Sequence, residues 1–146
     1  MSIDHKRISR YLLTIRENIQ DLELLLKQHS DQEFLKDRLL MKSLKYCLIE
    51  IAEAMSDILQ HILAKKKGIA ADGYVDVAVK AKQNSLISSD LMDRLLFFFK
   101  FRNVLVHRYW QVDDEELLKN TRQGGKDFEM FANRIDRIIS VNMSDM

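Results

Sequence analysis

Apolar residues recur every three or four positions along most of the chain. Between residues 4 and 28 the stripe consists of Ile8, Leu12, Ile15, Ile19, Leu22 and Leu26. Between residues 33 and 67 the same spacing continues through Met41, Leu44, Leu48, Ile51, Met55, Ile58 and Ile62. This period puts apolar side chains on one face of an α-helix. The two stretches therefore predict two long helices that pair as an antiparallel hairpin.

Capping signals predict where the other helices begin and end. Three lysines at 65–67 followed by Gly68 are typical of the last turn of a helix and its glycine terminus. A weaker pattern over residues 74–82 predicts a short helix. A serine at 88 or 89 can cap a further helix that runs to about residue 107.

The last predicted helix starts at Asp113, where Glu116 completes a capping box three residues on. Its apolar stripe consists of Phe128, Phe131, Ile135 and Ile138. The pair Gly124-Gly125 lies inside this helix and predicts a kink or a division there.

Length and composition strengthen the helical prediction. A chain of 146 residues predicts one domain over residues 1–146. The chain contains no proline and only four glycines, whereas turns of sheet proteins use both. Apolar residues make up 47% and charged residues 31%, a globular composition. The predicted fold class is all-α, an antiparallel bundle of four or five helices.

Charge and cysteine content limit the possible functions. A net charge of +1 argues against a non-specific nucleic-acid coat, but it allows an enzyme that holds RNA at one basic site. The only cysteine, Cys47, lies in an apolar helical stripe and is interpreted as a small buried residue. With no cysteine pairs, no secretory signal and no long apolar run, we expect a cytoplasmic protein without a membrane span.

The apolar pattern breaks at one level of the predicted helix over residues 88–107. One column, Leu91-Leu95-Phe98, is interrupted by Arg102, and its neighbour, Met92-Leu96-Phe99, is interrupted by Asn103. A buried polar group without a partner costs several kcal/mol. A local violation of good packing is expected at functional sites, so this level is the predicted site.

The spacing of the polar residues allows only some of them to meet. Asn103 and His107 are four residues apart, about 40° around a helix, so the amide can orient the imidazole. Arg102 is five residues from His107, about 140° around the helix. The two can meet one ligand only if the helix end unwinds or a second subunit supplies part of the site.

Each of these residues also has a structural interpretation. Arg102 can form an ion pair with Glu50 or Glu53, and His107 can stabilise a helix C-terminus. Tyr109 can cover the core as an amphipathic side chain. The gathering of these residue types within eight positions, where a core stripe becomes polar, favours a functional site.

Metal and phosphate motifs are weak elsewhere. Asp57 and His61 are four residues apart and could bind a metal, but no companion pair has ligand-like spacing. A polar contact between helices is the favoured interpretation. The sequence has no glycine-rich phosphate loop, nucleophile elbow or zinc spacing, so no metal and no cofactor are predicted.

The segment from Arg102 to Tyr109 resembles the signature of the HEPN superfamily. It is most similar to that of HepT-like toxins, in which an arginine, four residues, a histidine, one residue and a tyrosine recur. The resemblance extends to residues 34–37, 53–62 and 86–91. The chain departs from the family in lacking a proline between residues 68 and 74, and in the Trp110-Gln111 pair.

The resemblance implies a metal-independent RNA endonuclease that is the toxin of a toxin–antitoxin pair. Such toxins are homodimers whose signature helices meet at a cleft, and the antitoxin is a minimal nucleotidyltransferase that attaches AMP to the tyrosine, here Tyr109.

RNA is cut when its 2′-hydroxyl attacks the adjacent phosphate. A histidine suits the proton transfer, typically worth ~10²–10⁴-fold, and an arginine grips phosphate oxygens. His107 is therefore the expected acid or base, Arg102 the phosphate-stabilising cation and Asn103 the supporting residue.

Two other functions are consistent with the sequence. One is a non-catalytic RNA-binding module, and the other is a helical subunit that holds the nucleotidyltransferase. Either would form its complex without cutting RNA. A helical metal enzyme is disfavoured by the missing ligand pairs.

Overall fold

The computed structural model describes residues 2–144, except the side chains of residue 109 and residues 142–144. Within that range the chain forms six α-helices, one π-helical turn and one 3-10 turn, and no strand. They are α1 (His5–Gln28), α2 (Asp31–Lys36), α3 (Arg38–Ile62), η1 (Leu63–Lys67), α4 (Tyr74–Gln83), α5 (Ser89–Arg108), η2 (Tyr109–Gln111) and α6 (Asp114–Ser144). The predicted all-α fold class is confirmed.

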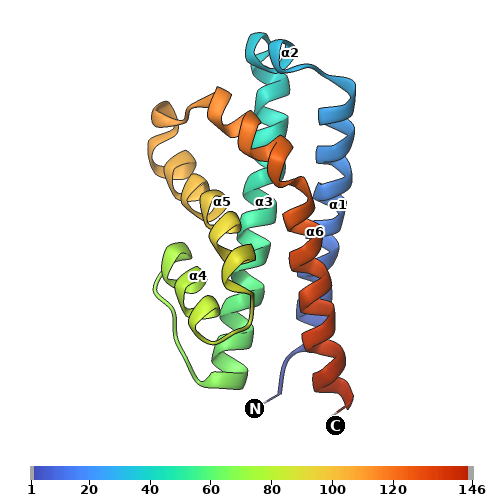
Figure 1. Ribbon diagram of the computed structural model, residues 1–146, viewed down its shortest axis with the longest axis vertical. Coiled ribbons are helices and arrows are strands. Elements are labelled where there is room, and N and C mark those ends of the chain that lie inside the picture. The colour runs from blue at the N-terminus through green and yellow to red at the C-terminus, as the bar shows by residue number, and fades with distance from the viewer. Residues whose placement is uncertain (1, 145–146) are drawn as a thin grey trace.

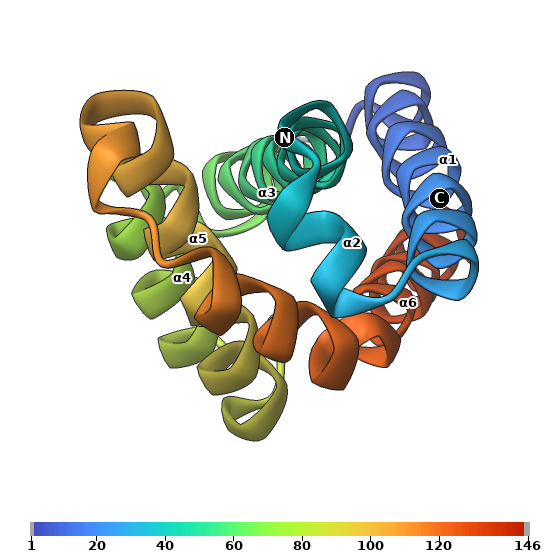
Figure 2. The ribbon, with the colours of Figure 1, turned by 90° about the horizontal axis from the view of Figure 1, so that it is seen from above.

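The helices form a lengthwise bundle with a helical pair on one side. The long helices α1 and α3 pack along their lengths as the predicted hairpin, and the C-terminal part of α6 runs beside α1 (Figure 1). Seen from above, α4 and α5 lie on one side of α3, while α1 and α6 lie on the other (Figure 2). The α4–α5 pair therefore packs on α3 from outside the hairpin.

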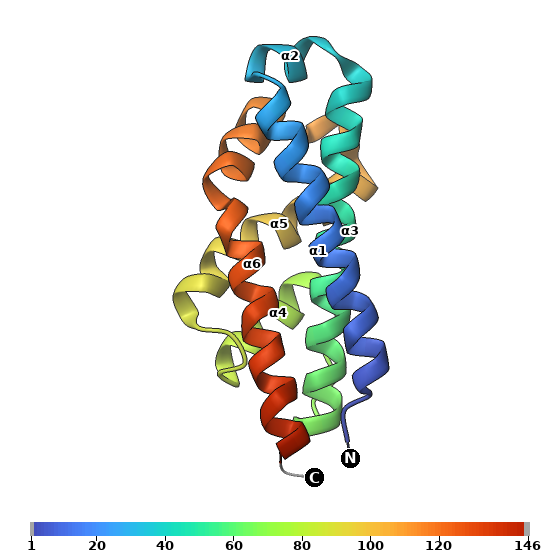
Figure 3. The same ribbon diagram turned by 90° about the vertical axis from the view of Figure 1, so that its right-hand side faces the viewer.

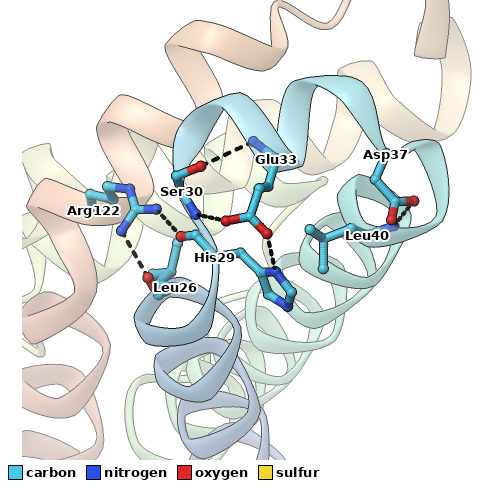
Figure 4. Close-up of polar contacts among 7 residues, drawn as sticks. All are labelled: Leu26, His29, Ser30, Glu33, Asp37, Leu40 and Arg122. Atoms are coloured by element: carbon cyan, nitrogen blue, oxygen red, sulfur yellow. Dashed lines mark hydrogen bonds and ion pairs between the residues drawn. The ribbon is translucent and has the colours of Figure 1, made fainter.

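The chain forms six α-helices rather than the predicted four or five, because the corner between α1 and α3 contains the short helix α2. Ser30 and Glu33 form a reciprocal capping box, with the Glu33 N–H donating to Ser30 Oγ at 3.2 Å (Figure 4). Asp37 ends α2 and caps α3, because its carboxylate accepts the N–H groups of Leu39 and Leu40. The predicted second helix is thus divided at Asp37, where a capping side chain competes with helix continuation.

Arg122 of α6 fastens this corner to the rest of the bundle. Its Nη1 and Nη2 donate to the carbonyl oxygens of Leu26 and His29 at 3.1 and 2.9 Å (Figure 4). Its Nε donates to the carboxylate of Asp31. All three guanidinium nitrogens are therefore bound to the end of α1 and the start of α2, where carbonyl groups lack helical partners.

The predicted apolar stripes form the core. Five of the six predicted residues of α1 and all seven of α3 are buried, and the α6 stripe is buried as well. Phe34, Phe99, Phe128 and Phe131 are among the largest fully buried side chains. Cys47 is 6% exposed, and burial raises the pKa of its thiol to about 11. The interpretation of this cysteine as a buried apolar residue is confirmed.

Gly124 lets α6 approach α5 closely. A Cβ at this position would lie 3.3 Å from Phe98 Cε2, and the ring of Phe98 packs edge-on against that of Phe128 at 4.7 Å between centroids. The helix is continuous through both glycines, so it is not divided. It does change direction along its length, which agrees with the predicted kink (Figures 1 and 3).

The remaining boundaries agree closely with the capping signals. Gly68 ends the π-helical turn with the left-handed φ of 64° that glycine favours. The Asp113 carboxylate accepts the N–H of Glu116 at the start of α6, at 3.1 Å.

Over the described residues, every helix is too short or too polar to cross a membrane.

Candidate functional site

Arg102 lies on the side of α5 that faces α3. Its Nε and Nη2 donate to Oε1 of Glu53 at 3.2 and 3.1 Å. Its side chain is 19% exposed, compared with 42% for Glu53. The ion pair that the sequence left open is present, and it joins Arg102 to Glu53. Glu50 instead accepts a hydrogen bond from Asn18 of α1 at 3.3 Å.

The ring of Tyr74 lies against the guanidinium of Arg102. The Cζ atom of Arg102 is 4.3 Å from the centroid of this ring, a cation–π contact. Burial raises the pKa of Tyr74, and the positive charge of Arg102 acts in the opposite direction. Tyr74 is the first residue of α4, so a helix that the sequence predicted only weakly contributes directly to the site.

His107 lies farther along the same helix on the exposed surface, while Asn103 is half-buried. Both side chains are described, and they form no hydrogen bond with each other. The orientation of His107 by Asn103 therefore stays a prediction. Two large apolar side chains near the histidine are also exposed, Val106 by 49% and Trp110 by 68%.

The helix remains regular between Arg102 and His107. α5 continues to Arg108, and the chain tightens into the 3-10 turn η2 only at Tyr109. Because a regular helix turns about 100° per residue, the two candidate catalytic residues of one chain stay about 140° apart around the axis. The structure thus does not bring them together by unwinding. The side chain of Tyr109, the candidate AMP acceptor, lies outside the described residues.

The histidine of α3 has a structural contact. His61 is 8% exposed, and its Nε2 accepts the backbone N–H of Asp4 at 2.9 Å, ahead of α1. Burial lowers the pKa of His61, and the nearby charges of Arg7 and Lys65 add to the effect. The part of the chain that the structure describes holds no group of three metal-ligating side chains. The hydrogen bond from the Asp4 N–H is a polar contact of the kind that the sequence favoured for His61.

Sequence reasoning found Glu53 as a possible partner of Arg102 but did not find Tyr74. Periodicity reports which face of a helix is apolar, and it carries no information on which distant helix packs there. The only sequence signal for Tyr74 was its position directly after the turn at Asp72-Gly73. A tyrosine after a turn does not by itself indicate a functional role.

The family of the chain follows from its sequence and its fold together. The family model described as Ribonuclease HepT-like matches residues 15–135, most of the chain. The helical bundle also matches that of HEPN toxins. The protein therefore belongs to the HepT-like ribonuclease family. No curated protein matches the chain significantly in sequence.

Solved structures show the same fold over nearly the whole chain. A tri-AMPylated Shewanella oneidensis HEPN toxin in complex with MNT antitoxin is 26% identical, with a TM-score of 0.80, and the match covers 90% of this chain and 97% of that one. A toxin–antitoxin structure with AMP-PNP is also 26% identical, with a TM-score of 0.78 and coverage of 88% and 97%. YutE of Bacillus subtilis, a cytosolic protein of unknown function, has a TM-score of 0.82 at 18% identity, with coverage of 97% and 94%. At that identity the similarity concerns the fold alone.

Proposed function

We propose that this protein is the toxin of a toxin–antitoxin pair and acts as an RNA endonuclease that needs no metal. The observation that carries the proposal is the family spacing of Arg102 and His107 on α5 and of Tyr109 at the start of η2, in a chain matched by the ribonuclease family model over residues 15–135. The similar toxin structures with their MNT antitoxin support the wider role.

The proposed reaction is an internal displacement on the RNA backbone. The 2′-oxygen forms a bond to the adjacent phosphorus, and the bond from phosphorus to the 5′-oxygen breaks. The 2′-hydroxyl gives its proton to a base, and the leaving 5′-oxygen takes one from an acid. His107 serves one of these roles, because imidazole titrates near neutral pH. Arg102 stabilises the charge that builds on the phosphate oxygens.

A homodimer completes the proposed site. Since α5 is regular from Arg102 to His107, the two residues of one chain point in different directions. Arg102 of one protomer can then act with His107 of its partner across a cleft. The exposed Val106 and Trp110 beside His107 give the apolar surface that protein contacts use.

Mixing inactive variants tests the shared site. A dimer of one Arg102→Ala chain and one His107→Ala chain retains one intact pair only if the two residues come from different protomers. We expect that co-refolding the two variants restores part of the wild-type rate. The separate variants stay inactive. A mixture that stays inactive, although mass spectrometry shows that mixed dimers form, contradicts the shared site.

We further propose that a cognate minimal nucleotidyltransferase inhibits the toxin by modifying Tyr109. The tyrosine oxygen attacks the α-phosphorus of ATP, and pyrophosphate leaves as the tyrosine–AMP bond forms. The new group adds bulk and negative charge two residues from His107, where substrate phosphate binds. The tri-AMPylated toxin among the similar structures supports this regulation. Modified protein that cuts RNA at the unmodified rate would contradict it.

The decisive experiment is RNA cleavage by purified, unmodified protein in excess EDTA. Wild type is compared with Arg102→Ala, His107→Ala and, as a control arginine outside the signature segment, Arg137→Ala on the exposed surface of α6. We expect products with 2′,3′-cyclic phosphate ends from wild type and from the control only. If unmodified wild type cuts no RNA but binds it or the nucleotidyltransferase, the non-catalytic RNA-binding or partner-holding function replaces this proposal.

A further inference from the structure

The guanidinium of Arg102 is held on one edge and one face. A guanidinium is planar and carries five N–H donors, which form two edges able to grip an anion. The carboxylate of Glu53 takes the Nε–Nη2 edge through Oε1, at 3.2 and 3.1 Å. The ring of Tyr74 lies on one face, 4.3 Å from Cζ. The contact with Glu53 leaves the Nη1–Nη2 edge for another anion.

These two contacts fix different degrees of freedom. The hydrogen bonds to Glu53 fix the rotation of the guanidinium within its plane, and the ring of Tyr74 fixes the tilt of that plane. An arginine side chain carries roughly 2 kcal/mol of rotamer entropy, so a held guanidinium loses less freedom when it binds a phosphate. With 42% of the Glu53 side chain exposed, the ion pair adds little to stability, which favours a positional role.

The backbone conformation at the start of α4 places Tyr74 against the guanidinium of Arg102. Gly73 has a φ of 98°, a left-handed conformation that L-residues rarely adopt, and α4 begins at the next residue. The helix then packs against both α3 and α5 (Figure 1). Tyr74 thus reaches the guanidinium from a helix that carries none of the signature residues.

We propose that Glu53 and Tyr74 are positioning residues that present the Nη1–Nη2 edge of Arg102 to a phosphate of the RNA backbone. This role rests on the proposed nuclease function of Arg102. Glu53 and Tyr74 do not touch the reacting atoms. They act through the orientation of one cation, so removing either lowers kcat more than it raises KM.

Paired substitutions test the role of each residue. Tyr74→Leu removes the aromatic face, whereas Tyr74→Phe keeps it. Glu53→Leu removes the acceptor, whereas Glu53→Gln keeps an oxygen in the same place. We expect each leucine variant to lose about tenfold in kcat, and each conservative variant to recover most of that loss. Val79→Ala, at an exposed position of α4, is the control for general effects on this helix.

A second readout follows Arg102 without requiring cleavage. In ¹⁵N-labelled protein, the exchange of the Arg102 Nε–H with water reports how firmly the guanidinium is held. We expect faster exchange in both leucine variants, with melting temperatures close to that of wild type. If wild type cuts RNA while Tyr74→Leu and Glu53→Leu keep its kcat or its exchange rate, the positioning role is wrong. If wild type cuts no RNA, the proposed function fails first, and this role of Arg102 fails with it.

Discussion

Two arginines at different places in the bundle show how the same side chain can be used for structure or left available for a ligand. Arg122 donates from all three of its nitrogens to the corner of α1 and α2. Arg102 donates from Nε and Nη2 to one carboxylate oxygen, so these contacts do not occupy its Nη1–Nη2 edge. Every guanidinium nitrogen of Arg122 holds the structure together, whereas Nη1 of Arg102 is not used by Glu53 and can donate to an anion.

Two histidines differ in the same way. His61 is 8% exposed and accepts a backbone N–H through Nε2, so its lone pair is used within the fold. His107 is exposed at the end of α5. A proton-transfer group must reach its substrate, which His107 can do and His61 cannot. Hydrogen-bond partners and exposure, rather than residue type, thus distinguish structural residues from candidate catalytic ones.

The largest expected effect is a difference in the rate of RNA cleavage between variants of Arg102 and Arg122. Arg102→Ala is expected to lower the rate of RNA cleavage by about 10²–10³-fold, because it removes a donor to the developing charge. Arg122→Ala should leave the rate per folded molecule unchanged. Initial rates, corrected for the folded fraction by circular dichroism, measure both. Equal losses in the two variants would contradict the distinction between them.

The next largest effect is a difference in the free energy of unfolding between variants of the two glycines of α6. Gly124→Ala places a methyl group 3.3 Å from the ring of Phe98, which is 2% exposed and cannot easily move. We expect a loss of about 1 kcal/mol in the free energy of unfolding. Gly125→Ala meets no atom within 4 Å and should gain about 0.5–1 kcal/mol from helix propensity. Urea unfolding of both variants measures the difference, and equal stabilities would show that the ring adapts.

A smaller loss of stability is expected where Arg122 holds the corner. Arg122→Ala removes three hydrogen-bonded contacts from the end of α1 and the start of α2. Because its side chain is 35% exposed, the expected cost is about 1 kcal/mol. Urea unfolding, with Arg137→Ala as a control on the exposed surface of α6, provides the measurement. A loss no larger than that of the control would show that the corner is held by other contacts.

The smallest effect is a dependence of stability on pH that belongs to His61. Its pKa is lowered from 6.5 in the folded state, so below that pH the unfolded chain binds more protons than the folded one. The free energy of unfolding should therefore fall as the pH is lowered from about 7.5 to about 5.5. His61→Gln keeps an acceptor for the Asp4 N–H but does not titrate, so it should flatten this dependence. An unchanged pH profile in that variant would assign the effect to another group.

The sequence by itself determined which residues form the helices and which of their faces are buried. The period of three to four along α1, α3 and α6 depends only on neighbours in the chain, and 16 of the 17 residues that it placed in the stripes of these helices are buried. Capping residues act over three or four positions, so Gly68 and Asp113 also gave correct boundaries. The signature residues were visible because they interrupt an otherwise regular stripe.

Only the tertiary structure decided how the signature residues are held. Whether Arg102 pairs with Glu50 or Glu53 depends on the rotation and register of α3 against α5, which no local period encodes. The contact with Tyr74 depends on how α4 folds back onto that pair. That the helix end does not unwind between Arg102 and His107 is likewise known only from the regularity of α5 through Arg108. Local sequence sets the faces of each helix, but contacts between distant helices arise only when all of them pack around one core.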